Sequence, residues 1–324
     1  MNQINQIQEF INVAYDPLEW LRLRIAAEQY GDAQKNRIAA CSRVGVKADG
    51  NPTKNAHLLG IDAEASSAYL DAARNMEKIA KRQMTLAYRQ VVPANIQQWV
   101  KDNKGLGEPS MARLLGHLGH PLIARPHHWE DNIAKVQDAD GKVPKRILVA
   151  DEPYIRTKEQ LLAYAGHGAP GRRRKGMTKE EAAALGNPSV KMLLYLVSCG
   201  VKKIKEPGVS QYRTIYDDER TRYGIDDKTK TKAENATNSK IHSVECVRCG
   251  TKGKPAEVGT PWKDGHKDAA AMRVVGKAIL TDLWLLCGGG SSDVPTFEIP
   301  EEIDMAEIDA IMDAELEDVS EFLD

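Results

Sequence analysis

The sequence is poor in aromatic residues and has no long apolar run, and both absences restrict the class of protein. Aromatic residues make up 6% of the 324 residues, and only three are Phe, so a hydrophobic core must rest on Leu, Ile, Val, Ala and Met. No stretch approaches the roughly 18 consecutive apolar residues that a membrane helix needs, so the sequence predicts no membrane partner. Stretches rich in Ala, Lys, Arg and Glu favour helices instead.

Targeting, disulfide and nucleotide-loop patterns are also missing. The chain opens on Met1–Gln6 without a basic stretch followed by an apolar one, so no secretory signal is expected. The five cysteines are odd in number and irregularly spaced, which suits a reducing compartment better than a disulfide scaffold. No Gly-x-x-x-x-Gly-Lys-Ser/Thr loop occurs, which leaves ATP use unsupported. We therefore expect a cytoplasmic protein, of a bacterial cell or its nucleoid.

Basic residues are absent from the C-terminal end of the chain. The last one is Lys277, and 14 acidic residues follow it. All 45 Lys and Arg residues thus lie in residues 1–277, which carry a net charge of +13, whereas residues 278–324 carry −14. A body this basic has the electrostatics of a protein that binds a polyanion. A tail this acidic is typical of a segment that binds a partner or imitates the polyanion.

Helical periodicity dominates the hydrophobic pattern, and the sequence predicts a mainly α fold. Only residues 146–150 form a convincing strand pattern, and it is short. Helix start signals are Asp16-Pro17, a capping box of Thr178 and Glu181, and Asn187-Pro188. The predicted helices cover residues 17–43, 62–90, 94–102, 157–165, 178–185, 188–199, 209–223 and 267–286.

Three domains are expected. Residues 1–93 are predicted to form a long helical hairpin similar to a coiled coil, which offers a surface for oligomerisation. Residues 94–287 are predicted to form a helix-hairpin-helix domain with a small Cys/His element. Residues 288–324 combine a Gly/Ser linker with an acidic tail.

Residues 95–118 have the pattern of a helix-hairpin-helix motif. A short helix ends at Gly105-Leu106-Gly107, and a second begins near Pro109. The glycines let the turn bring backbone N–H groups close to a phosphate, and the new helix N-terminus adds partial positive charge. Such a hairpin grips the nucleic-acid backbone and reads little sequence; an ordinary helical corner is the alternative. The candidate contacts are Lys101, Lys104, Gly105, Leu106, Gly107 and Arg113.

A second candidate contact is the basic loop at 171–176. Arg172, Arg173, Arg174 and Lys175 are consecutive and are bounded by glycines. Four adjacent cations repel one another unless an anion is near, and Arg forks onto phosphate oxygens. The loop therefore predicts direct contact with nucleic acid. A solvated loop, or a site for the protein's own acidic tail, is the alternative.

A cluster of potential metal ligands lies within residues 242–266. Cys-x-x-Cys followed by Gly has the form of a zinc knuckle, because the turn lets both thiolates face one ion. A tetrahedral site needs two more ligands, and the nearest candidates are histidines. The alternative is a pair of reduced cysteines with solvent-facing histidines, and Cys199 is an alternative to one histidine. The predicted ligands of a structural Zn²⁺ are His242, Cys246, Cys249 and His266.

The acidic tail has a helical pattern. Within 299–323 apolar residues recur every three or four positions, opposite an acidic face. One hypothesis is that this helix docks on the basic body and competes with nucleic acid. A second is that it binds a protein partner as a helix in a groove. A solubilising end is the alternative.

Several short motifs, taken in order, resemble a known family. They are the glycine hairpin, Leu161–Gly166, the basic loop and Gly186–Leu194. This order resembles the C-terminal domain of DEDD-class insertion-sequence transposases, the RNA-guided recombinases. The tracts 212–216, 246–250, 265–267 and 280–284 resemble transposase-like proteins of actinobacteria and their phages, and the resemblance covers roughly residues 95–286.

Two departures limit what the resemblance implies. The family carries an N-terminal RNase-H-like domain, whereas residues 1–95 have helical patterns and match the family's helical insert better. The family's nucleophilic serine lies between the Ala-Tyr-Ala-Gly and Gly-Asn motifs, and residues 167–186 contain no Ser. The resemblance therefore implies binding of duplex or branched DNA without implying strand cleavage.

We therefore expect a non-enzymatic DNA-binding protein of a phage or mobile element that acts in recombination or replication, with RNA as an alternative ligand. One alternative function is a divergent recombinase or nuclease that uses Mg²⁺ held by acidic residues such as 217–219 and 226–227. Another is an adaptor or inhibitor whose tail captures a host protein that processes nucleic acid.

Overall fold

A computed structural model gives the fold of the chain. It describes Ile11 and residues 15–45, 63–137, 141–168, 177–178, 181–182, 184–206, 208–224, 239–251 and 254–290. Within these residues the fold is mainly helical, as predicted. The helices are α2 (Pro17–Val44), α3 (Ala63–Val91), α4 (Ala94–Asp102), α5 (Glu108–Leu118), α6 (Lys158–Tyr164), α8 (Pro188–Lys202), α9 (Gln211–Arg222) and α11 (Asp264–Leu286).

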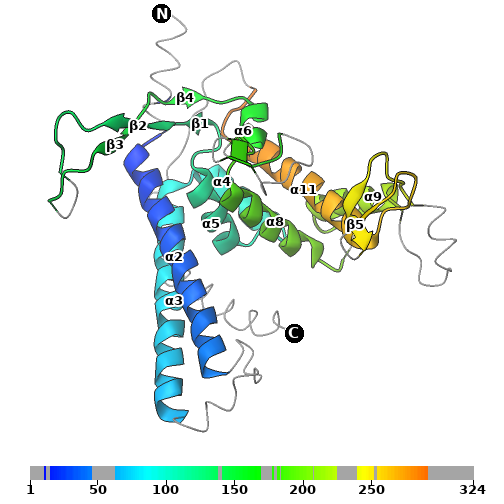
Figure 1. The fold of residues 1–324 in the computed structure, drawn as a ribbon, viewed down its shortest axis with the longest axis horizontal. Helices are drawn as coiled ribbons and strands as arrows, with labels where there is room; N and C mark the ends of the chain where they lie inside the picture. The colour runs from blue at the N-terminus through cyan, green and yellow to red at the C-terminus, as the bar shows by residue number, and fades with distance from the viewer. Residues whose placement is uncertain are drawn as a thin grey trace, which may run out of the picture.

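Helices α2 and α3 form a long hairpin that projects from the body of the molecule (Figure 1). Asp16 caps α2, since its carboxylate accepts the backbone N–H of Leu18 at 2.8 Å, and Pro17 occupies the first turn. Gly45 ends the helix in the left-handed conformation. An ion pair between Arg37 and Glu77 joins the two helices.

One hydrophobic core joins the base of this hairpin to the helical body. Buried side chains of α2 and α3, such as Leu23 and Tyr88, belong to the same cluster as those of α4, α5, α8 and α11. Helices α2 and α5 cross closely, because a Cβ placed on Gly116 would lie 2.6 Å from the Cβ of Ala27. The outer part of the hairpin has its own small cluster, which includes Cys41 and Leu70. The predicted boundary at residue 93 therefore falls inside a shared core.

Three two-stranded antiparallel sheets complete the described fold. The strand predicted at 146–150 is confirmed as β3 (Arg146–Ala150), and it pairs with β2 (His127–Asp131). Strand β1 (Ile123–Ala124) pairs with β4 (Tyr154–Ile155), and β5 (Cys246–Thr251) pairs with β6 (Lys254–Ala256). The other five strands were not predicted. Strands β1, β4 and β6 have only two or three residues, too few to show alternation, and the pairing of β2 with β3 and of β5 with β6 depends on a partner strand that the local pattern does not identify.

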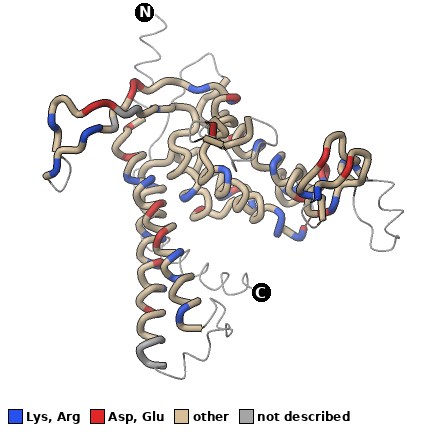
Figure 2. The backbone as a smooth tube through the Cα atoms, viewed as in Figure 1, with Lys and Arg blue, Asp and Glu red and all other residues tan. Residues whose placement is uncertain are grey.

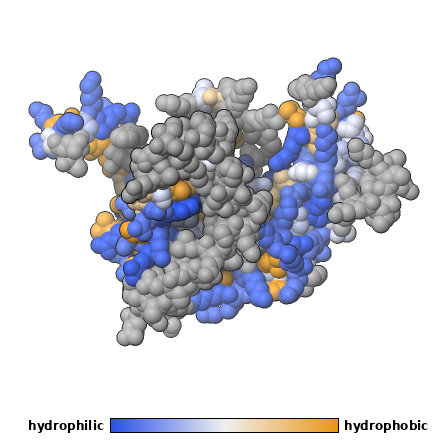
Figure 3. Space-filling model, turned by 90° about the horizontal axis from the view of Figure 1, so that it is seen from below, coloured by the Kyte–Doolittle hydropathy of each residue, from blue (hydrophilic) through white to orange (hydrophobic). Residues whose placement is uncertain are grey.

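Local signals at the helix ends are confirmed. Thr178 and Glu181 exchange the two bonds of a capping box, with N···O distances of 2.8 and 3.2 Å. Asn187 caps α8, and its side-chain oxygen accepts the N–H of Ser189 at 2.9 Å. Among the described residues, no helix is long and apolar enough to cross a membrane. The described residues visible in Figure 3 are mainly hydrophilic, with small hydrophobic patches.

Candidate metal centre and basic cleft

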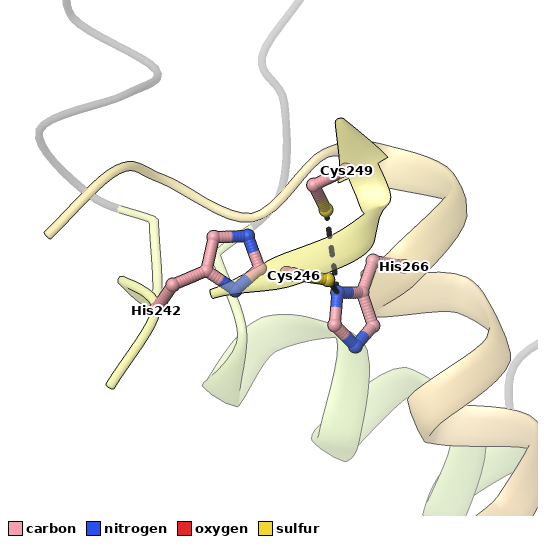
Figure 4. Close-up of side chains that lie close together, drawn as sticks. All are labelled: His242, Cys246, Cys249 and His266. Atoms are coloured by element: carbon pink, nitrogen blue, oxygen red, sulfur yellow. Dashed lines mark hydrogen bonds between the residues drawn. The ribbon is translucent and has the colours of Figure 1, made fainter. Parts of the chain in front are cut away.

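The four predicted metal ligands come together at one end of the helical body. Cys246 and Cys249 lie on β5, His266 lies in the first turn of α11, and His242 lies on the segment before β5. Figure 4 shows their side chains converging from these three segments. Each residue offers a ligand atom, and these atoms all lie within 4.8 Å of one another. The structure therefore contains a Cys/His cluster that could hold a metal ion.

The spacing of the cluster fits a tetrahedral ion. The Nδ1 atom of His266 lies 3.5 Å from Cys246 Sγ and 3.3 Å from Cys249 Sγ. With Zn–S near 2.3 Å and Zn–N near 2.0–2.1 Å, the S···N edge of a tetrahedron is about 3.5 Å. The two contacts thus match the separation between ligands that share one ion.

The antiparallel pairing of β5 with β6 positions the two cysteines. Gly250 passes so close to β6 that a Cβ there would lie 1.9 Å from the carbonyl oxygen of Lys254, so only glycine fits. The backbone N–H of Lys263 donates to Cys249 Sγ at 3.3 Å. Such a bond stabilises a thiolate, which is the form of cysteine that binds a metal.

His242 is held in place and has one unsatisfied ring nitrogen. Its backbone N–H donates to the Thr260 carbonyl at 2.9 Å, and its carbonyl accepts the Gly259 N–H at 2.8 Å. The side chain is buried, and no group in the described part of the chain bonds its Nε2 atom. A buried polar atom without a partner is costly, and a metal ion at the cluster would satisfy it.

The electrostatics keep the histidines neutral. The pKa of His266 is lowered to about 4, first by burial and then by His242, Arg248, Arg273 and Lys240. Burial also lowers the pKa of His242 and raises that of the Cys249 thiol. Neutral imidazoles are the metal-binding form, whereas the thiol of Cys249 must lose its proton when a metal binds.

A basic cleft lies beside the cluster, between α8, α11 and β5. Its volume is about 370 Å³, and its lining combines Lys191, Arg248 and Arg273 with Tyr195 and with no Asp or Glu. Arg248 and Arg273 are exposed, and neither forms an ion pair with a carboxylate in the described ranges. Figure 2 shows basic segments along the helices that lead to this end of the molecule.

The positive charge of the cleft also acts on a neighbouring histidine. His167 lines the cleft, and its pKa is lowered to about 4, first by burial and then by Lys191, Lys277 and Arg273. His167 is therefore neutral near pH 7, and the fixed charge of the cleft comes from Lys and Arg.

Helices α4 and α5 and the turn between them occupy the segment for which a helix-hairpin-helix motif was predicted. Leu106 is buried and anchors the turn, as expected. Gly105 has a φ of +93°, and a Cβ there would lie 2.9 Å from Val201 Cα, so the turn packs on the end of α8. Lys101, Lys104 and Gly107 are exposed. No side chain caps the N-terminus of α5, which leaves backbone donors there for solvent or a ligand.

Two charged residues of this motif are engaged inside the protein. Glu108 forms a two-pronged ion pair with Arg89 of α3, with N···O distances of 2.7 and 3.0 Å. Arg113 turns to α2, where it donates to Gln34 at 2.9 Å and lies over the Tyr30 ring. The structure thus brings Lys101 and Lys104 to the turn and directs Arg113 to the hairpin of α2 and α3.

Other predicted residues lie elsewhere. Arg172–Lys175 and the acidic tail 299–323 lie outside the described residues. Of the acidic run considered for Mg²⁺, Asp217 pairs with Arg213 and Glu219 with Arg222. In the described ranges, the Cys/His cluster is the one group of three or more ligands that could share a metal ion.

The cleft residues were missed by sequence reasoning, although a signal for two of them was present. Arg248 lies inside the Cys-x-x-Cys motif, and Arg273 follows His266 by two helical turns. No family model matches the chain, and comparisons with curated proteins and with solved structures find no significant similarity.

Proposed function

We propose that this protein binds nucleic acid, with DNA as its ligand, through the basic cleft beside the Cys/His cluster, and that a structural Zn²⁺ braces this site. The observation that carries the proposal is a cleft lined by three cations and no acid. Arg248 and Arg273 form no ion pair with a described carboxylate, and phosphate groups relieve the repulsion between cations that lie close together. The resemblance to insertion-sequence transposases favours DNA of a phage or mobile element, in recombination or replication.

The cleft also offers surfaces for bases or sugars. Tyr195 is 47% exposed and Met192 is 49% exposed, and both line the cleft next to its cations. A groove that combines basic side chains with an exposed ring is typical of proteins that bind nucleic acid with little sequence preference. The hairpin turn with Lys101 and Lys104 supplies a second contact for the backbone in this proposal.

The proposed metal acts on the cleft through the chain. Arg248 lies between the two cysteine ligands on β5, so an ion that fixes Cys246 and Cys249 also fixes the backbone of Arg248. His266 begins the helix that carries Arg273, which lies about 10 Å further along it. A bound ion would therefore hold both arginines in their places.

Zinc suits the ligand set. Two thiolates and two imidazoles at tetrahedral spacing are typical of structural Zn²⁺ sites with no open coordination position. Such an ion contributes to folding and performs no chemistry on a substrate. The proposal therefore describes a binding protein, and its acidic tail is a candidate competitor for the cleft or a ligand for a protein partner.

The test is a mobility-shift panel of single-stranded, duplex and four-way-junction DNA and of RNA, at several salt concentrations. We expect the affinity to fall steeply with salt and the double variant Arg248→Gln/Arg273→Gln to bind at least tenfold more weakly. The matched control is Arg22→Gln/Lys35→Gln, which removes two exposed charges from α2 and should leave binding nearly unchanged. Metal analysis of the purified protein should find one Zn²⁺ per chain.

Two results would contradict the proposal. One is an affinity that barely changes between low and high salt. The other is equal loss of binding in both double variants, because general charge would then replace the cleft as the cause. If the purified protein contains no Zn²⁺ and still binds DNA with normal affinity, the metal plays no part in binding, and only the cleft remains as the binding site.

A further inference from the structure

A second cleft lies at the opposite end of the body from the Cys/His cluster. The start of α2, the end of α5, strands β1 and β4 and helix α6 surround it (Figure 1). Its volume is about 560 Å³. Pockets of about 300–1,000 Å³ are the usual size for small-molecule ligands.

Arg156 lies in the wall of this cleft and is fixed by the backbone around it. The side chain is 4% exposed, and Nε donates to the Pro121 carbonyl at 2.8 Å. The Nη2 atom donates to the carbonyl of His120. The backbone of Arg156 is held as well, by an N–H bond to the Leu122 carbonyl at 2.9 Å and by the indole N–H of Trp284 at 2.9 Å. The guanidinium is therefore rigid before any ligand arrives.

Arg156 has no carboxylate partner among the described residues, although it is buried. No carboxylate is among the groups that favour its charge, which are tyrosines and Cys287. Burial lowers the pKa of Arg156 to about 10, so the guanidinium is still charged at neutral pH. A buried charge is normally paired, and the lack of a carboxylate partner in the described ranges points to an anion that these residues do not supply.

Arg125 and three tyrosines also line the cleft. The Nε atom of Arg125 donates to the backbone carbonyl of Asp151 at 3.2 Å, and no described carboxylate pairs with this side chain. The Arg156 guanidinium lies 5.6 Å from the ring centre of Tyr164. Tyr154 and Tyr164 are 42% and 39% exposed, and Tyr15 lines the cleft beside them. No Asp or Glu lines the cleft.

We infer that this cleft binds a nucleotide, with its phosphate on Arg125 and Arg156 and its base against the tyrosine rings. Arginine presents a planar fork that matches phosphate oxygens, and every base has a face that stacks on an aromatic ring. The nucleotide is either free or the phosphorylated end of a nucleic-acid strand, since both present the same chemistry. This site is separate from the cleft between α8 and α11 and does not depend on it.

The test is calorimetric titration of the full-length protein with 5′-AMP, adenosine and inorganic phosphate at low salt. We expect 5′-AMP to bind in the micromolar range, phosphate to compete weakly and adenosine to bind at least tenfold more weakly than 5′-AMP. The variants Arg125→Gln and Tyr154→Ala should each weaken 5′-AMP binding by tenfold or more. Both positions are partly or well exposed, so the variants are expected to fold, which the thermal midpoint will check.

Competition separates the two sources of the nucleotide. A 5′-phosphorylated oligonucleotide that displaces 5′-AMP, where the unphosphorylated oligonucleotide does not, assigns the site to a strand end. Failure of both oligonucleotides to displace bound 5′-AMP assigns it to the free nucleotide. Either result supports the inference, because each requires the same phosphate and base contacts.

Three outcomes overturn the inference. They are no binding of 5′-AMP, equal binding of 5′-AMP and adenosine, or an affinity unchanged in Arg125→Gln. The control variant is Arg248→Gln/Arg273→Gln, which should bind 5′-AMP as tightly as the natural sequence. It also separates the two ideas, since a failure of the cleft beside the Cys/His cluster leaves 5′-AMP binding intact, and the reverse holds for Arg125→Gln.

Discussion

The indole of Trp262 lies face to face with the imidazole of His266, with ring centres 4.0 Å apart and an angle of 3° between the planes. The same indole stacks on His242 at 5.8 Å. Trp262 therefore sets the orientation of both predicted histidine ligands, although it offers no ligand atom of its own. Groups that orient ligands in this way commonly change metal affinity by 10–100-fold.

The first prediction follows from this stacking. Trp262→Ala should weaken Zn²⁺ binding about tenfold, because His266 can then rotate its Nδ1 away from the cysteines. Competition with a chromophoric chelator measures the affinity. Trp262→Phe is the matched control, since it keeps a ring against His266 and should bind Zn²⁺ almost as the natural sequence does. Equal affinity in Trp262→Ala and Trp262→Phe would show that the stack plays no part.

The Cys/His cluster was predictable because its signal is local. Cys246 and Cys249 lie three residues apart on β5, and the histidines nearest to them in sequence are the ones that the fold brings beside them. The helices were predictable for the same reason, since Asp16, Asn187 and the 3.6-residue periodicity act within a few residues.

The basic cleft was not predictable because its cations come from separate segments. Lys191 lies on α8, Arg248 on β5 and Arg273 on α11, and only the tertiary fold joins them. Arg113 illustrates the reverse case. Its position in the glycine hairpin suggested a phosphate contact, but packing of α5 on α2 gives it Gln34 and Tyr30 as neighbours. A sequence pattern cannot tell which face of a helix meets another helix 79 residues away.

The second prediction concerns the turn of the glycine hairpin. Gly105→Ala should lower the free energy of unfolding by about 2 kcal/mol or more, since it combines a positive φ with a close approach to α8. Gly208 is the matched control, because its φ is +79° but a Cβ there meets no atom within 4 Å. Gly208→Ala should cost about 1 kcal/mol. Urea denaturation measures both, and equal costs would contradict the packing of the turn on α8.

The third prediction concerns the ion pair between Arg89 and Glu108. Its side chains are 7% and 12% exposed, so removing one partner leaves a charge in a poorly solvated place. Glu108→Gln should destabilise the protein by about 3 kcal/mol. The double variant Arg89→Met/Glu108→Leu should be more stable than Glu108→Gln, because no unpaired charge remains. A double variant as unstable as the sum of the single ones would contradict this account.

The fourth prediction is a loss of stability in acid, and it rests on the burial of His120. Burial, together with the charge of Arg156, lowers the pKa of this imidazole to about 3. The backbone N–H groups of Leu122 and Ile123 donate to Nδ1 at 3.1 and 3.0 Å. Both bonds require an unprotonated Nδ1, so protonation of this atom would break the two hydrogen bonds that hold the segment between α5 and β1.

The direction of this pH effect follows from the pKa of histidine in the unfolded and in the folded chain. In the unfolded chain a histidine has a pKa near 6.5, so between about pH 6 and pH 3 the unfolded state holds a proton that the folded state lacks. The contribution of His120 to the free energy of unfolding is therefore fully present above about pH 6.5. It falls by about 1.4 kcal/mol for each pH unit below that value. His167 and His266, each with a pKa of about 4, act in the same direction.

The variant His120→Asn isolates the share of His120, because an amide oxygen can accept the same two N–H bonds and does not titrate. Urea denaturation between pH 4 and pH 7 should give this variant a shallower dependence on pH, by about 1.4 kcal/mol per unit between pH 5.5 and pH 4. His167→Asn is the companion variant. It should reduce the pH dependence of the free energy of unfolding only above about pH 4. An unchanged slope in His120→Asn would mean that the imidazole of His120 is solvated in the folded protein.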